Sequence, residues 1–316
     1  MEIFNKKIDF FFIKFPIIFP FIYLLALYSF PQFETFIIIF TIFLLAEPHF
    51  GATYPIIFDR KNNEYFKKKK IVFYYGSALI LLYCILGFFY FKYFFLLSFY
   101  AANIFHVTRQ SVGICKLYNK NQKELLYQSQ IIYIFNFIFF IIGYFRFYIN
   151  IIPDNLLFYL NIIILALIFI FSMVYVKVFK FSENYFTLMS GVIIFYPICF
   201  VSNPVHAILL GVTIHYSQYL FITWKVYVGR KGLLENYNLK KFGLYFKNKF
   251  FLIILAYSFF MTIISYSGKV DDEMIKNLIF IPITAQMLHF YLDSFIWRFS
   301  EESNRENTLK YILKKI

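Results

Sequence analysis

Long apolar runs, separated by short polar segments, cover almost the whole chain. Because a helix needs about 20 apolar residues to cross a hydrocarbon core of about 30 Å, runs of this length predict membrane-spanning helices. The ten predicted helices are residues 15–30, 33–58, 71–90, 93–115, 129–149, 155–176, 184–201, 204–224, 249–267 and 277–298. Little sequence remains for a soluble domain. We therefore expect an all-α integral membrane protein, a polytopic bundle of about ten transmembrane helices forming a single domain over residues 1–316.

The basic residues between the predicted helices fall in alternate loops. Six lie in residues 59–70, three in 116–128, two in 177–183 and seven in 225–249. The intervening loops hold none, one or two. Because lysine and arginine favour the cytoplasmic side of a membrane, this alternation predicts that both termini are cytoplasmic.

The composition agrees with a membrane protein and narrows its partners. Hydrophobic residues make up 61% of the 316 residues, and the mean hydropathy is +0.65. The formal net charge is +14, but the rule that orients membrane helices already explains the lysines in the short loops. We therefore expect membrane lipids, and no nucleic acid, as partners. Cys84, Cys115 and Cys199 occur singly in apolar segments, so they predict neither a zinc knuckle nor a disulfide.

All five histidines fall within predicted helices. His49, His106, His215 and His289 lie on the second, fourth, eighth and tenth predicted helices, which all run from the outside to the inside. Each is about 9 to 10 residues from the cytoplasmic end, a depth of about 14 Å at about 1.5 Å per residue. Four imidazoles at one depth can converge on one point. His206 lies nine residues before His215 and points to the opposite side of a straight helix, so it is more typical of a packed, hydrogen-bonded residue.

Each of the four histidines has polar neighbours on its own predicted helix. These are Glu47, two residues before its histidine; Arg109 and Gln110, three and four residues after; Gln218, three after; and Asp293, four after. Offsets of three or four place two side chains on one helix face. A charge within a span costs a few kcal/mol or more unless it is paired or faces a cavity. Asp293, Gln110 and Glu47 are therefore candidates to orient the histidines, and Arg109 either balances charge there or forms a salt bridge between helices.

This arrangement predicts a metal site. A neutral imidazole binds a metal through one ring nitrogen while a carboxylate, amide or carbonyl fixes the other. Nitrogen ligands suit iron, zinc or copper rather than hard, oxygen-seeking ions.

The residues around the histidines are similar to motifs of a known family. Pro48, His49 and Gly51 are similar to its P-H-G element, with the glycine displaced by one position. Ile214 and His215 with Trp224 are similar to an I-H element followed by tryptophan, and His289, Asp293, Trp297 and Arg298 to a late element of histidine, aspartate, an aromatic residue and arginine. On these short segments the chain resembles the bacterial Brp/Blh-type membrane β-carotene dioxygenases. It departs from them at Ala52 or Thr53, where the first motif has its acid, and at Gln110, which replaces an acid.

The resemblance implies Fe(II) held by four histidines, O2 as cosubstrate and a long apolar substrate that enters from the bilayer. It implies carotenoid cleavage to retinal, in the inner (cytoplasmic) membrane of a bacterium. We therefore expect a membrane-embedded non-haem iron oxygenase. A membrane zinc hydrolase acting on a lipid and a non-enzymatic proton-coupled transporter remain alternatives. A two-iron desaturase would need about eight clustered histidines, and a cytochrome b-like carrier would need haem ligands at two depths.

Overall fold

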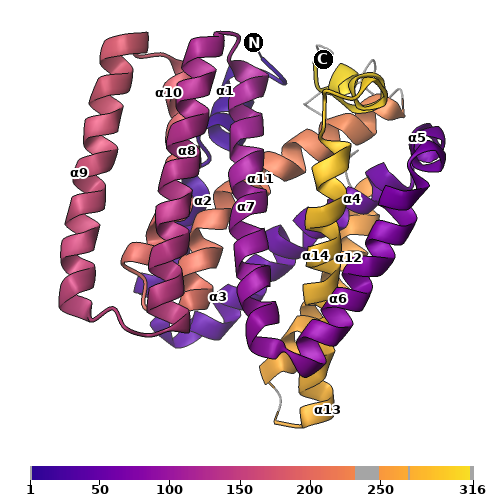
Figure 1. The fold of residues 1–316 in the computed structure, drawn as a ribbon, viewed down its shortest axis with the longest axis horizontal. Helices are drawn as coiled ribbons and strands as arrows, with labels where there is room; N and C mark the ends of the chain where they lie inside the picture. The colour runs from indigo at the N-terminus through magenta and orange to yellow at the C-terminus, as the bar shows by residue number, and fades with distance from the viewer. Residues whose placement is uncertain (1, 232–248, 270, 314–316) are drawn as a thin grey trace. The chain divides into compact units, whose positions relative to one another are not determined.

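The computed structural model describes residues 2–231, 249–269 and 271–313, and these residues form helices and no strand (Figure 1). The predicted all-α class is confirmed. Part of the most basic predicted loop, residues 225–249, lies outside the described residues.

Seven helices among the described residues are long and apolar enough to cross a membrane. They are Pro31–Ile57, Ile71–Tyr90, Gln122–Tyr148, Asn155–Phe179, Pro204–Arg230, Phe250–Lys269 and Glu273–Ile296. The segments Lys6–Lys14 and Ile18–Ser29, bent by 57° relative to each other, make an eighth if they form one span. These helices indicate a membrane protein, as the sequence predicted. The count of ten spans and the cytoplasmic termini stay predictions.

Two predicted spans take another form. Residues 93–115 lie in helix α7 (Lys92–Tyr118), which is long enough to span but has a polar middle that makes it less apolar than the seven. Residues 184–201 divide into α10 (Glu183–Ile193) and a 3₁₀ turn, Tyr196–Cys199. An 11-residue helix rises only about 16 Å, which is too short to cross a bilayer alone.

The chain divides into two compact units. Unit 1 contains residues 1–32 and 103–218, and unit 2 contains residues 33–102 and 219–316. Two of the three boundaries fall within continuous helices, α7 and α11 (Pro204–Arg230), and the third falls in the 3₁₀ turn Pro31–Phe33. The expectation of a single domain over residues 1–316 stays a prediction, and each unit is described by itself.

Unit 1 contains several long helices, and side chains cap the N-termini of α8 and α10. Besides parts of α7 and α11 it contains α1 (Lys6–Ile8), a π-helical segment (Asp9–Lys14), α2 (Ile18–Ser29), α8 (Gln122–Gly143), a second π-helical segment (Tyr144–Tyr148), α9 (Asp154–Phe179) and α10. Asn121 caps α8, its Oδ1 accepting from the backbone N–H groups of Lys123 and Glu124, and Ser182 caps α10. Helix α10 packs against α8 and against the first π-helical segment. These contacts bury the face of α10 that contains Leu188 and Val192.

Unit 2 contains two packed helix pairs. Its long helices are α3 (Glu34–Thr41), α4 (Glu47–Ile57), α6 (Ser77–Tyr90), α12 (Lys249–Tyr266) and α14 (Phe280–Ile296), and its shorter ones are α5 (Asn63–Lys68), α13 (Glu273–Lys276), α15 (Glu302–Asn304) and α16 (Lys310–Leu313). Helix α4 packs on α12, and α6 packs on α14. A π-helical segment, Ile42–Ala46, joins α3 to α4 directly before the first candidate histidine.

Helix α11 extends farther than its apolar run predicts. Lys225 and Arg230, which we expected in a loop, lie within the helix and are buried. The guanidinium of Arg230 donates to the backbone carbonyls of Asn307 and Ile56 and to the hydroxyl of Thr308. The buried Arg230 guanidinium thus has hydrogen-bond acceptors from distant parts of the chain, although the local sequence predicted a solvent-exposed loop.

Candidate metal-binding histidines

In unit 2, His49 of α4 and His289 of α14 form a buried pair. His49 is 1% exposed and His289 is 0% exposed, and their ring centroids lie 4.6 Å apart. Tyr219 of α11 packs edge-on against both, with centroid distances of 4.5 Å to His49 and 5.4 Å to His289. The pairing arises because α4 and α14 contact each other and both histidines lie on buried helix faces.

A hydrogen-bonded cluster of hydroxyls and a carboxylate surrounds His289. The Thr53 hydroxyl lies 2.7 Å from His289 Nδ1, 2.5 Å from the Tyr219 hydroxyl and 3.2 Å from Asp293 Oδ1. The Tyr219 hydroxyl donates to Asp293 Oδ1 at 3.0 Å, and Asp293 Oδ2 lies 3.7 Å from His289 Nε2. Asp293 is thus in contact with its histidine, as the four-residue offset predicted.

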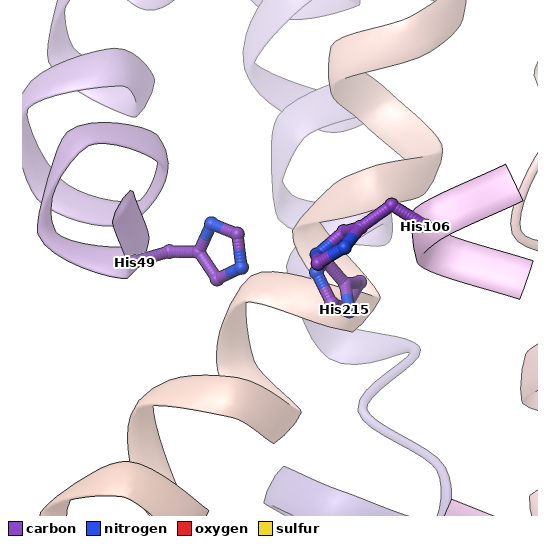
Figure 2. Close-up of side chains that lie close together, drawn as sticks. All are labelled: His49, His106 and His215. Carbon is purple, nitrogen blue, oxygen red and sulfur yellow. The ribbon is translucent and has the colours of Figure 1, made fainter. Parts of the chain in front are cut away.

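In unit 1, His106 of α7 and His215 of α11 form a second buried pair (Figure 2). Their ring centroids lie 5.6 Å apart, with the ring planes nearly perpendicular. Gln110 Nε2 lies 3.2 Å from His106 Nε2, so the amide one turn along α7 contacts the imidazole, as the sequence predicted.

The other predicted companions have partners elsewhere. Glu47 is buried and hydrogen-bonded to Gln286 of α14 and Ser265 of α12. Gln218 donates from Nε2 to the backbone carbonyl of Ile13 at 2.7 Å, which ties α11 to the first π-helical segment.

Arg109 is exposed, and its guanidinium lies over the Phe105 ring one turn away. His206 is buried, and its Nδ1 hydrogen-bonds the Tyr23 hydroxyl at 2.7 Å, which agrees with a packed structural residue.

Thr53 and Tyr219 were not predicted as site residues, yet the sequence contains a signal for them. Each of the four candidate histidines is followed, four residues later, by a residue that can hydrogen-bond through its side chain: Thr53, Gln110, Tyr219 and Asp293. His206 is followed at that offset by Leu210. The shared offset therefore separates the four candidates from the fifth histidine, but it becomes visible only if hydroxyls are counted along with acids and amides.

The donor chemistry fits a metal ion. The four candidate histidines and Asp293, but not His206, belong to groups of side chains that could hold a metal ion. Imidazole nitrogens suit iron, zinc and copper, and a ligand histidine typically has its second ring nitrogen fixed by a neighbour, as Thr53 does for His289.

Comparison with known proteins identifies no relative from which a function could be transferred. The chain matches no family model, no curated protein and no solved structure.

Proposed function

We propose that the four histidines predicted from the sequence, His49, His106, His215 and His289, are metal ligands in a membrane-embedded enzyme. The observation that carries the proposal is that each unit buries one pair of the four histidines that the sequence singled out. Buried polar side chains in an apolar protein are costly and usually functional. Metal coordination would account for the burial of these imidazoles. The hydrogen-bonding residues four positions after each histidine would help to orient the ligands.

We propose Fe(II) as the metal and O2 with a long apolar compound as the substrates. Iron held by histidines would supply the activation of O2 that oxidation of an apolar double bond requires. The protein's own contribution is to hold the imidazoles in fixed orientations and to keep the site away from water by burial. The resemblance to the Brp/Blh-type dioxygenases points to a carotenoid as substrate and retinal as product, in a bacterial inner membrane.

A zinc hydrolase acting on a membrane lipid is the second candidate. The Asp293 carboxylate favours it, because it lies 3.7 Å from His289 Nε2 and is held by the Tyr219 hydroxyl. A fixed carboxylate beside a zinc ligand can act as the general base that activates water.

Metal analysis of the purified full-length protein, combined with lipid extraction, tests the proposal. We expect about one iron per chain in the wild type and its loss in His49→Ala, His106→Ala, His215→Ala and His289→Ala. His206→Ala is the matched control, since it removes a buried histidine from the same helix as His215 and should keep the iron.

Each other outcome selects an alternative. Stoichiometric zinc without iron would reject the oxygenase and favour the hydrolase. Retention of metal in both the His106 and His215 variants would refute their role as metal ligands. If metal-free protein catalyses uptake into vesicles, the histidines belong to a transporter.

A further inference from the structure

Four consecutive lysines, Lys67 to Lys70, stand directly before the candidate span Ile71–Tyr90 of unit 2. Lys67, Lys68 and Lys70 are exposed and are called the lysine cluster below, whereas Lys69 is half-buried. The preference of basic residues for one side of a membrane accounts for lysines somewhere in this loop. It does not account for their concentration in the last four positions before a span.

Aromatic packing holds the segment that carries the lysine cluster. Helix α5, which contains its first two lysines, is too short to be stable alone in water. Tyr65 of α5 is buried, with its ring centroid 5.3 Å from that of Phe73, and the centroids of Phe66 and Phe73 lie 4.1 Å apart. The Phe73 ring in turn lies 5.9 Å from that of Phe295 on α14. The lysines are therefore attached to a packed base.

The lysine cluster keeps its positive charge within the described part of unit 2. Lys69 forms a salt bridge to Glu301, and the ion pairs among the described residues include none to the lysine cluster. Glu64, the nearest acidic residue along the chain, is exposed in the first turn of α5. The cluster thus presents three positive charges within four residues to its surroundings.

Exposed apolar side chains begin directly after the lysine cluster. Ile71 is 77% exposed, and Tyr74 and Tyr75 are also exposed in the same π-helical segment, Ile71–Gly76. Exposed apolar surface on a candidate span is favourable against acyl chains rather than water, and tyrosine is enriched at the level of the headgroups. The lysine cluster therefore lies where this helix would meet the phosphates of a bilayer.

We propose that the lysine cluster binds the phosphate of an anionic phospholipid whose acyl chains lie along Ile71, Tyr74 and Tyr75. Ammonium groups donate charge-assisted hydrogen bonds to phosphate oxygens. Groups of four to eight basic residues beside a span are typical of sites for anionic lipids, and this loop contains six. A zwitterionic lipid such as phosphatidylcholine brings its own cation, which the lysines repel. The site is independent of the proposed metal.

Native mass spectrometry of the delipidated full-length protein in detergent measures the binding of single lipids. Phosphatidylglycerol and phosphatidylcholine with the same acyl chains are compared. Each lysine near an anionic lipid strengthens the attraction about five-fold, so the lysine cluster predicts a preference on the order of 10- to 100-fold for phosphatidylglycerol. The preference should shrink as the ammonium acetate concentration rises, because salt screens exposed charges.

The preference should disappear when the lysine cluster is changed to glutamine, with Lys67→Gln, Lys68→Gln and Lys70→Gln in one chain. It should survive when the same three positions become arginine, which keeps the charge. The apparent Tm without added lipid should stay near the wild-type value in both variants, because the replaced side chains are exposed. Metal content should also be unchanged, which separates this test from that of the proposed function.

The matched control removes three exposed lysines from another basic loop, with Lys116→Gln, Lys120→Gln and Lys123→Gln in one chain. This variant has the same net charge as the glutamine variant of the lysine cluster, and it should keep the preference.

Three results would overturn the proposal. One is equal binding of the two lipids by the wild type, and another is the same loss in both glutamine variants, since net charge alone would then explain it. The third is displacement of the lipid by excess soluble glycerol 3-phosphate, which would assign the lysines to a free phosphate compound.

Discussion

Gly51 sets how closely helices α4 and α12 approach beside His49. A Cβ atom added at Gly51 would lie 2.7 Å from Tyr257 Cδ1 and 3.0 Å from its Cγ, which is closer than carbon atoms in proteins pack. The overlapping atoms are the ring and the Cβ atom of Tyr257, so the overlap cannot be relieved by moving the far end of a flexible side chain. Overpacking of this kind costs about 1–3 kcal/mol. Because Gly51 lies two residues after His49, the displaced backbone carries the candidate ligand with it.

Thermal unfolding in detergent measures the effect, and Gly113 supplies a matched control. Gly113 is also within a helix, but a Cβ there meets nothing within 4 Å. Gly113→Ala should therefore be neutral or stabilising by up to about 1 kcal/mol, as alanine is the better helix former. We expect Gly51→Ala to lower both the apparent Tm and the metal affinity.

A double-mutant cycle tests the cause. Tyr257→Ala removes the ring that the new methyl group would strike, so Gly51→Ala should cost little in that background. If Gly51→Ala were as stable as Gly113→Ala, or if its cost were unchanged with Tyr257→Ala, the packing argument would be refuted.

Three further outcomes follow from the structure. Arg230→Met should lower the free energy of unfolding by about 3 kcal/mol in denaturant titrations, because it leaves two backbone carbonyls without their donor. Arg298→Met is the control at an exposed site, and it should change that free energy by less than about 0.5 kcal/mol. The hydrogen bond from Lys14 lowers the pKa of Glu183, so this pair stabilises the fold above the ordinary glutamate pKa and its contribution is lost as the pH falls through the lowered value. Glu183→Gln should therefore flatten the acid side of the stability profile, by a small amount because the side chain is 44% exposed. A chelator should lower the Tm of metal-loaded protein, since a ligand at 100 times its Kd adds about 2.7 kcal/mol of stability, and an unchanged Tm would argue against a bound metal.

Much of the fold follows from hydropathy, because each span must be apolar by itself. Seven described helices and the bent N-terminal pair correspond to predicted runs. The C-terminal end of α11 could not be predicted from hydropathy. Arg230 is buried there because residues 56, 307 and 308 supply its hydrogen-bond acceptors, and the local sequence does not reveal these contacts. The shortness of α10 is likewise decided by a 3₁₀ turn inside an apolar run, where hydropathy shows no break.

The site residues show the same division. Helix periodicity predicts contacts within one helix, and it found Asp293 beside His289 and Gln110 beside His106. Helix periodicity could not predict that Gln218 donates to the backbone carbonyl of Ile13, because Ile13 lies in another helical segment. The hydrogen bond from Thr53 to His289 was not predictable either, because its two residues lie on different helices.

The π-helical segment before α4 gives unit 2 a tolerance for changes in chain length. A π turn holds about one residue more than an α turn, and residues 42–46 take up that excess just before His49. Removing one residue from this segment could return it to α-helical hydrogen bonding with the flanking residues still in phase. The same deletion between His49 and Thr53 would rotate the rest of the helix by about 100°. Insertions and deletions should therefore accumulate in the π-helical segment and be absent from the turn beyond it.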